Sequence, residues 1–146
     1  MFKSVETSLK KGGTFIFEEP YLGSMLEKTS YDQIYDEHFY MFSANSIKSI
    51  IEGFNLKLVD AEKITTHGGS MRYYVQKTQI KKISYNLKKI FIYEKKIKIT
   101  KIDTIKNFVK NCNNSKKRII KMIETLRNKK IKIFGYGATS KSTTIL

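Results

Sequence analysis

Two adjacent glycines between two apolar segments constrain the fold of this chain more than any other feature. One apolar segment begins at Leu56 and runs to about Thr66, and apolar residues alternate with polar ones over residues 71–75. Alternation with a period of two is typical of a strand with one buried face. The intervening turn, His67-Gly68-Gly69-Ser70, contains glycines that adopt positive φ without strain. The pattern predicts an antiparallel hairpin that closes the edge of a sheet.

A further strand is predicted near the N-terminus. Residues 2–9 have helical spacing, and Lys10-Lys11-Gly12-Gly13 follows them with basic residues and a glycine stop. The apolar run of residues 14–17 then predicts a buried strand, which Pro20 ends soon after Glu19.

A stretch rich in aromatic and acidic residues follows this strand. Residues 18–43 hold six of the thirteen carboxylates and one of the two histidines. From Tyr31 onward, ring-bearing side chains recur at helical spacing and predict a helix that carries them on one face. These side chains are Tyr31, Tyr35, His38 and Phe42. Such a stripe usually packs in a core, but phenols beside an imidazole can also line a pocket in which protons move.

The rest of the chain is predicted to be mainly helical. Apolar residues recur three and four positions apart over residues 44–52, 80–94 and 105–126. Ser43 is a suitable N-cap for the first of these helices. A short strand over residues 131–134 then leads into a glycine loop, residues 135–138, and a helix from Lys141.

The charge is unevenly distributed along the chain. Residues 1–62 carry six lysines and ten carboxylates, a net charge of −4, whereas residues 63–146 carry 22 basic and three acidic residues, a net charge of +19. The basic half suits a polyanion such as a nucleic acid, a membrane surface or a diphosphate. Its lysines are spread around the helices without clustered stacking aromatics, so we expect no specific nucleic-acid partner. Biased codon usage is an alternative explanation of the lysine excess.

Cysteine usage and hydropathy further limit the class of protein to which this chain can belong. Cys112 is the only cysteine, so the chain has no internal disulfide and no cysteine-based zinc site. No apolar run is long enough to span a bilayer, and the N-terminus lacks a signal-peptide pattern. We therefore expect a cytoplasmic protein with no membrane partner. Nothing in the sequence indicates an oligomeric state.

Three segments resemble one family. They are EEPYLGSMLEKTSYDQIYDEHFYMFS (residues 18–43), THGGSMRYYV (66–75) and GYGATSKSTTIL (135–146). In this order and at these separations they resemble S-adenosylmethionine-dependent C-methyltransferases that act on nucleotide-linked deoxysugars. The first segment is the most specific.

The resemblance implies an α/β fold divided into three parts. Residues 1–79 would be the C-terminal part of a Rossmann-like methyltransferase domain, and residues 80–128 a helical connecting segment. Residues 129–146 would begin a second Rossmann-like domain, which binds the sugar nucleotide. Relatives also have a zinc-binding cysteine cluster and a glycine-rich loop for S-adenosylmethionine. This sequence has neither. We therefore expect a fragment that binds no zinc, lacks most of the S-adenosylmethionine site and is inactive alone.

The resemblance places the catalytic chemistry in the segment Tyr35-Asp36-Glu37-His38, in which Asp36 is expected to be structural. C-methylation beside a ketone needs a base for the α-proton and a donor that stabilises the enolate. By the resemblance, His38 is the base, Glu37 orients it, and Tyr35 binds the substrate or its enolate. Histidine suits this role because its ordinary pKa leaves it largely neutral at cellular pH. A metal site is disfavoured because zinc usually gathers more nitrogen or sulfur ligands.

The same resemblance assigns substrate binding to eight residues: Tyr31, His67, Ser70, Arg72, Gly135, Tyr136, Gly137 and Lys141. Arg72 could hold a phosphate in a bidentate manner. The loop before Lys141 is not a Walker A motif, because Ser140 stands where that motif needs glycine, but it places amides and a helix start after a strand. Both glycine segments can instead be turns that serve packing alone.

The sequence thus predicts part of a C-methyltransferase that methylates a carbon beside the ketone of a nucleotide-linked 4-keto-deoxysugar, through proton removal by His38 and an enolate. The alternative is a non-catalytic module that binds a sugar nucleotide or another polyanion through the basic half.

Overall fold

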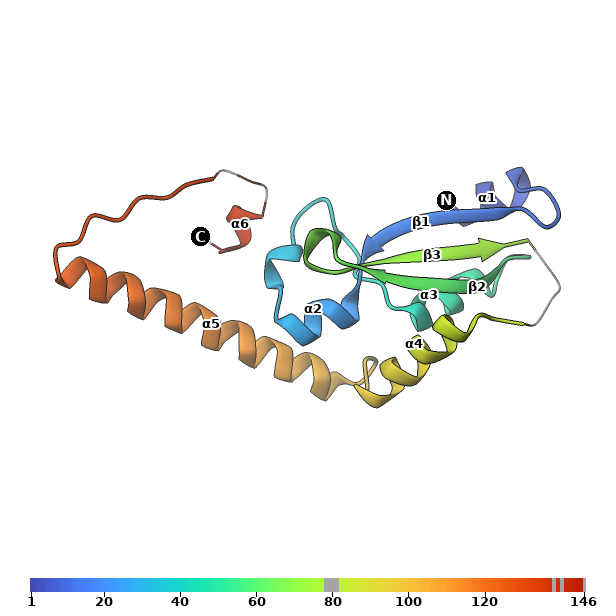
Figure 1. Cartoon of the computed structure of the whole chain (residues 1–146). Coiled ribbons are helices and arrows are strands. Elements are labelled where there is room, and N and C mark those ends of the chain that lie inside the picture. The colour runs from blue at the N-terminus through green and yellow to red at the C-terminus, as the bar shows by residue number, and fades with distance from the viewer. Residues whose placement is uncertain (78–81, 138, 140, 146) are drawn as a thin grey trace.

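The computed structural model describes residues 1–77, 82–137, 139 and 141–145 and shows a mixed α/β chain (Figure 1). Its elements in chain order are α1 (Phe2–Ser8), β1 (Thr14–Pro20), α2 (Leu22–Lys28), η1 (Tyr31–Gln33), α3 (Ala44–Ile51), β2 (Lys57–Ile64), η2 (Thr66–Gly68), β3 (Ser70–Gln76), α4 (Tyr85–Lys96), α5 (Ile102–Asn128) and α6 (Ser142–Ile145). The predicted α/β class is confirmed. The expected boundary at residue 79 and the expected helix start at residue 80 lie outside the described residues.

The sheet has three antiparallel strands in the order β1-β3-β2. The hairpin predicted from the two glycines is confirmed, because η2 and Gly69 join β2 to β3. β3 does not close the sheet, however. Tyr73 on β3 faces Phe17 of β1 on one side and Ala61 of β2 on the other. Among the described strands, β1 and β2 are therefore the edges.

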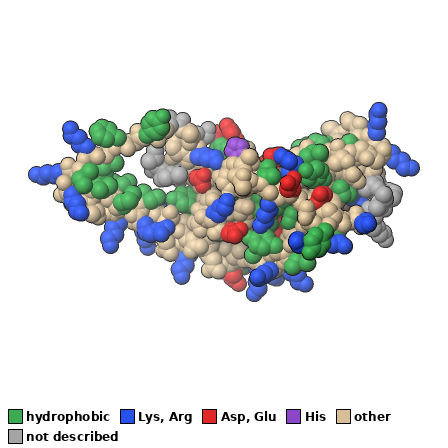
Figure 2. Space-filling model, in the orientation of Figure 1, with side chains coloured by type: hydrophobic (Ala, Val, Ile, Leu, Met, Phe, Trp, Pro, Cys, Tyr) green, Lys and Arg blue, Asp and Glu red, His purple; other side chains and the backbone are tan. Residues whose placement is uncertain are grey.

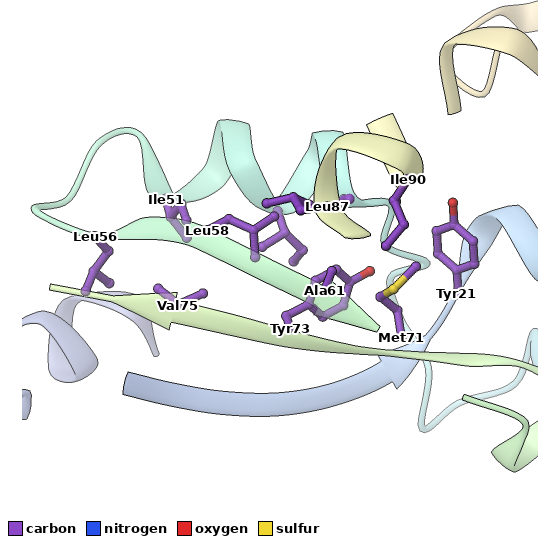
Figure 3. Packing of buried hydrophobic residues seen from close by; sticks show 12 residues of the cluster. Tyr21, Ile51, Leu56, Leu58, Ala61, Met71, Tyr73, Val75, Leu87 and Ile90 are labelled. Atoms are coloured by element: carbon purple, nitrogen blue, oxygen red, sulfur yellow. The ribbon is translucent and has the colours of Figure 1, made fainter. Parts of the chain in front are cut away.

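Helices α3 and α4 cover one face of this sheet and enclose the core (Figure 3). The core side chains come from β2, β3, both helices and the segments beside them. They are Tyr21, Ala44, Ile47, Ile51, Leu56, Leu58, Ala61, Met71, Tyr73, Val75, Leu87 and Ile90. Each large apolar side chain buried in this way contributes about 1.5–3 kcal/mol. Because Leu87 and Ile90 belong to α4, this helix is part of the same core as the sheet.

Strand β1 confirms the strand predicted over residues 14–17, but it is only partly covered, so the prediction that this strand is buried is wrong. Its side chains alternate between exposed and half-buried, and Ile16 is 51% exposed. On the covered side, Phe17 stacks on Tyr73 with ring centroids 5.0 Å apart and meets Phe2 of α1 edge-on at 5.9 Å. Only alternate β1 side chains reach the core, because strand side chains point to opposite faces of a sheet.

Glu94 on α4 is fully buried and ties three elements together. Its carboxylate accepts hydrogen bonds from the Tyr21 hydroxyl (3.0 Å), from the Ala44 amide (2.7 Å), and from the backbone and side-chain nitrogens of Asn45 (3.0 and 2.6 Å). Ala44 and Asn45 open α3, whose first amides have no partner within the helix. A buried carboxylate is tolerated here because four donors compensate it.

The helix predicted from Tyr31 to Phe42 is wrong. Only η1, three residues long, is helical there, and the chain runs irregularly to Ser43. Phe42 forms a parallel bridge with Tyr21, and its carbonyl accepts the Leu22 amide at 2.9 Å. That bridge needs extended backbone, so pairing with a distant segment overrides the local spacing. The expected N-cap at Ser43 is confirmed, since its side chain accepts from the Ser46 amide in a capping box.

Helix α5 forms a long arm that leaves the core, and the chain after it runs back toward η1 (Figure 1). The short strand predicted over residues 131–134 is not found; these residues pair with no strand in the described chain. The Thr144 hydroxyl donates to the Ile34 carbonyl at 2.9 Å, which places α6 against η1. Among the described helices, none combines the length and apolar character needed to cross a bilayer.

Candidate active site

Tyr35 and His38 lie together in the loop that follows η1. A turn, not a helix, brings them together: the His38 amide donates to the Tyr35 carbonyl at 2.9 Å. Their rings meet edge-on, with centroids 4.8 Å apart and an interplanar angle of 83°. Both side chains are half-buried, whereas Asp36 and Glu37 between them are exposed. The loop therefore presents an imidazole and a phenol side by side.

The protonation state of the phenol follows from its surroundings. Burial, and then the charge of the Glu37 carboxylate, raise the pKa of Tyr35 above its ordinary value. A tyrosine is already protonated at neutral pH, and the raised pKa keeps Tyr35 protonated to still higher pH. Tyr35 is thus a hydrogen-bond donor, which is the property that stabilising a developing oxyanion requires.

Two further aromatic side chains follow the pair directly. Phe39 is 87% exposed and Tyr40 is 72% exposed. Large apolar side chains that remain exposed next to a polar pair are typical of a surface that contacts a ligand or another part of the protein. Phe39 and Tyr40 are adjacent aromatic residues in the sequence, but they lie outside the predicted stripe of Tyr31, Tyr35, His38 and Phe42.

The η2 turn packs directly on α2 and η1, which explains both of its glycines. Gly68 has φ 80°, and Gly69 has φ 130°. A Cβ on Gly69 would lie 2.6 Å from that of Ser24, and one on Gly68 would lie 3.1 Å from Gln33 Nε2. Lys28 Nζ also donates to the Gly68 carbonyl at 2.6 Å. The two glycines are required by conformation and by close packing alike.

Of the predicted substrate residues, His67 lies within this turn and Ser70 follows it. His67 is exposed and has φ 50°. Ser70 is buried, and its hydroxyl donates to the Thr66 carbonyl at 3.1 Å. Only His67 therefore has a side chain open to a ligand.

Arg72 is engaged by carboxylates on both neighbouring strands. Its guanidinium lies 2.5 Å from Glu18 Oε1 on β1 and 3.6 Å from Glu62 Oε2 on β2. The hydrogen bond to Glu18 raises the pKa of Arg72. To hold a phosphate in a bidentate manner, Arg72 would have to exchange one of these carboxylates for it.

The C-terminal glycine loop reaches the site only at its far end. Gly135, Tyr136 and Gly137 are exposed. Lys141, in contrast, lies 3.9 Å from Asp32 Oδ2 of η1. Tyr31, at the start of η1, is half-buried beside that pair. The structure thus brings Lys141 and Tyr31 into one region and leaves the two glycines exposed in irregular chain.

Gln33 is a residue that the sequence did not single out. Its side chain is 4% exposed, and its Oε1 atom is buried with no hydrogen-bond partner in the described residues. Its Nε2 atom lies 3.4 Å from Asp32 Oδ2. Gln33 is the last residue of η1 and lies against Gly68, so it joins two of the three family-like segments. Its position between Tyr31 and Tyr35 gave no sign of this role.

Over the described ranges, no three His, Cys, Asp or Glu side chains gather closely enough to hold a metal ion. The site instead consists of a half-buried imidazole and phenol, carboxylates around them, and a lysine at its margin.

Together, fold and site define a mixed α/β chain whose polar loops meet at one end of a small antiparallel sheet. Residues 65–146 match the family model of the C-methyltransferase C-terminal domain. The chain belongs to this family, and the C-methyltransferase class predicted from its three segments is confirmed. It is also 35% identical over 71 residues to the C-methyltransferase NovU of Streptomyces niveus. That alignment covers 49% of this chain and 17% of NovU.

Proposed function

We propose that this chain is part of an S-adenosylmethionine-dependent C-methyltransferase, and that the complete enzyme methylates the carbon beside the ketone of a nucleotide-linked 4-keto-deoxysugar. The contact between the Tyr35 and His38 rings is the observation that carries the proposal. Membership of the family and the likeness to an enzyme named a C-methyltransferase support it.

In the proposed reaction, the residues of this chain remove a proton. The neutral imidazole of His38 takes the proton from the carbon next to the ketone, and the electron pair of that C–H bond moves into the carbonyl to form an enolate. The Tyr35 hydroxyl donates a hydrogen bond to the enolate oxygen. The exposed Glu37 carboxylate stabilises the imidazolium that results. His67 and Lys141 are proposed to contact the substrate, and Arg72 would do so after releasing Glu18 or Glu62.

S-adenosylmethionine supplies the methyl group in this chemistry, and the topology of the described residues supports a site for it elsewhere in the enzyme. The sheet is antiparallel throughout, and it has no strand that ends in a glycine-rich loop and continues into a helix. We propose that the cofactor is bound by other parts of the enzyme and that this chain alone transfers no methyl group. Calorimetric titration of the chain with S-adenosylmethionine should show no saturable heat, and micromolar affinity would overturn this placement.

The domain division is also a proposal. Residues 1–79 would belong to a Rossmann-like methyltransferase domain, residues 80–128 would connect it, and residues 129–146 would open a Rossmann-like domain for the sugar nucleotide. Two observations support the proposal that further strands of the complete enzyme pair with β1 and with residues 131–134. The outer edge of β1 has no strand partner among the described residues. Ile131, Ile133 and Phe134 are exposed although apolar, in extended chain that could pair with further strands.

A second candidate function rests on α5. Figure 2 shows Lys and Arg side chains over much of the arm, with hydrophobic side chains between them. A non-catalytic module could bind a sugar nucleotide or another polyanion through this surface. The functions are separated by His38→Ala in the complete enzyme. Loss of turnover by roughly 10²–10⁴-fold supports a general base, whereas unchanged turnover favours the module.

A further inference from the structure

A polar cleft lies between the end of α2 and the middle of α5, beside the candidate active site. Its volume is about 500 Å³, which falls within the roughly 300–1,000 Å³ typical of small-molecule sites. It is lined by Lys28, Thr29, Asn111, Asn114, Ser115 and Arg118. α2 and α5 approach each other at this point.

The α5 side of the cleft is a continuous stripe. Asn111, Asn114, Ser115 and Arg118 stand at positions i, i+3, i+4 and i+7, so they share one face of the helix. Two helices usually meet through apolar side chains. Of these four side chains, Ser115 is half-buried and the other three are exposed, so the stripe lines an open cleft and does not pack against α2.

The polar side chains of this lining are open to solvent and are therefore available to a ligand. Within the described residues, the side chains of Thr29, Asn111, Asn114, Ser115 and Arg118 have no hydrogen-bond or ion-pair partner. Lys28 donates to the Gly68 carbonyl at 2.6 Å, which leaves its charge without a carboxylate. The cleft thus holds two uncompensated positive charges and no acidic side chain.

This chemistry selects an anion with several acceptor oxygens. A guanidinium can donate two parallel hydrogen bonds to a phosphate, and an ammonium on the opposite wall adds a second charge. The two asparagine amides can both donate and accept, which suits a hydroxyl or carbonyl next to the phosphate. We infer that this cleft binds a small molecule that carries a phosphate or diphosphate group.

The inference rests on the cleft alone and does not require the proposed reaction. Lys28 nevertheless connects the two, because its ammonium bonds the Gly68 carbonyl in the turn that carries His67. A phosphate held by Lys28 and Arg118 would lie next to the candidate active site. If the proposed function holds, the ligand would be the diphosphate part of that substrate.

The test uses the 146-residue chain, pyrophosphate and isothermal titration calorimetry at an ionic strength of about 0.15 M, at which exposed charges more than about 8 Å apart are largely screened. We expect saturable binding of one pyrophosphate per chain, and at least tenfold weaker binding by Arg118→Gln. Arg127→Gln is the matched control, since it removes the same charge from α5 further along the helix and should bind as the parent does. Both arginines are exposed, so thermal unfolding should show both variants folded.

The outcomes separate the alternatives. No saturable binding, or equal weakening by Arg118→Gln and Arg127→Gln, would overturn the inference, because the second result assigns binding to the general charge of α5. Repeating the titration with a nucleoside diphosphate identifies the source of the ligand. If the nucleoside diphosphate binds more tightly than pyrophosphate, and Asn114→Leu reduces its affinity to that of pyrophosphate, the ligand is a nucleotide. If the two ligands bind equally, the cleft recognises the phosphate group alone. Failure of these titrations leaves proton removal by His38 unaffected, so the two proposals fail separately.

Discussion

The ring of Tyr35 stands edge-on to that of His38, with centroids 4.8 Å apart, in a turn closed by the bond between the His38 amide and the Tyr35 carbonyl. An imidazole and a protonated phenol held in this way combine a proton acceptor with a hydrogen-bond donor. Neither group depends on a helix for its position. The pair therefore persists although the predicted helix does not form.

Replacing Gly69 should destabilise the protein. Gly69→Ala would force a side chain into φ 130° and place its Cβ 2.6 Å from that of Ser24. Backbone strain of this kind costs about 1–3 kcal/mol, before the clash is added. Gly53→Ala is the control, because that position is open and has no positive φ, so it should be neutral or stabilising by about 0.4–1 kcal/mol. Urea unfolding measures both; equal midpoints would contradict the packing of η2 on α2.

Removing the Glu94 carboxylate should be among the most damaging single changes. Glu94→Leu would leave the Tyr21 hydroxyl and the amides of Ala44 and Asn45 without an acceptor. Each buried orphan donor costs about 1–3 kcal/mol, so we expect a loss of more than about 3 kcal/mol in the free energy of unfolding. Glu52→Gln, which breaks only the exposed pair with Lys48, should cost less than about 1 kcal/mol. Similar losses in both variants would contradict the role of Glu94.

Stability should fall in alkaline solution. Burial raises the pKa of Tyr21 and of Tyr73 far above the ordinary value, and burial with the hydrogen bond to Glu27 raises the pKa of Tyr93 to about 12. In the unfolded chain these phenols ionise near pH 10, about the ordinary value. Their stabilising contribution is therefore complete below about pH 10 and is lost as the pH rises through the folded-state values. Urea midpoints at pH 8 and pH 11 test this. Between these two pH values, the urea midpoint of Tyr93→Phe should decrease less than that of the parent. An equal parent midpoint at both pH values would contradict the prediction.

Local patterns predicted the elements whose contacts are local or strictly periodic. The β2–β3 hairpin follows from alternation and two glycines, and the start of α3 follows from Ser43. Helix α2 was missed because Gly23 and Ser24 lower its helical propensity. Gly23 is retained there because a Cβ would lie 2.5 Å from the Tyr21 ring.

In the site, too, the contacts between residues close in the sequence were predictable, whereas the contacts between distant segments were not. Tyr35 and His38 are three residues apart, so a turn brings them together as a helix would. The roles of Gln33 and Lys28 depend on a turn some 35–40 residues away, to which no local pattern points. The pairing of Phe42 with Tyr21 is likewise a long-range contact, and it decides the conformation of the intervening loop.

The measurement that tests the central claim most directly is exchange of the substrate's α-proton with deuterated solvent, followed by NMR in the complete enzyme. Proton removal needs the base but not the methyl group, so exchange isolates the step assigned to His38. His38→Ala should slow exchange by roughly 10²–10⁴-fold with little change in substrate affinity. The exposed neighbour Asp36→Asn should exchange at the parent rate. If folded His38→Ala protein exchanges the proton as fast as the parent, His38 is not the base and the proposed mechanism is wrong.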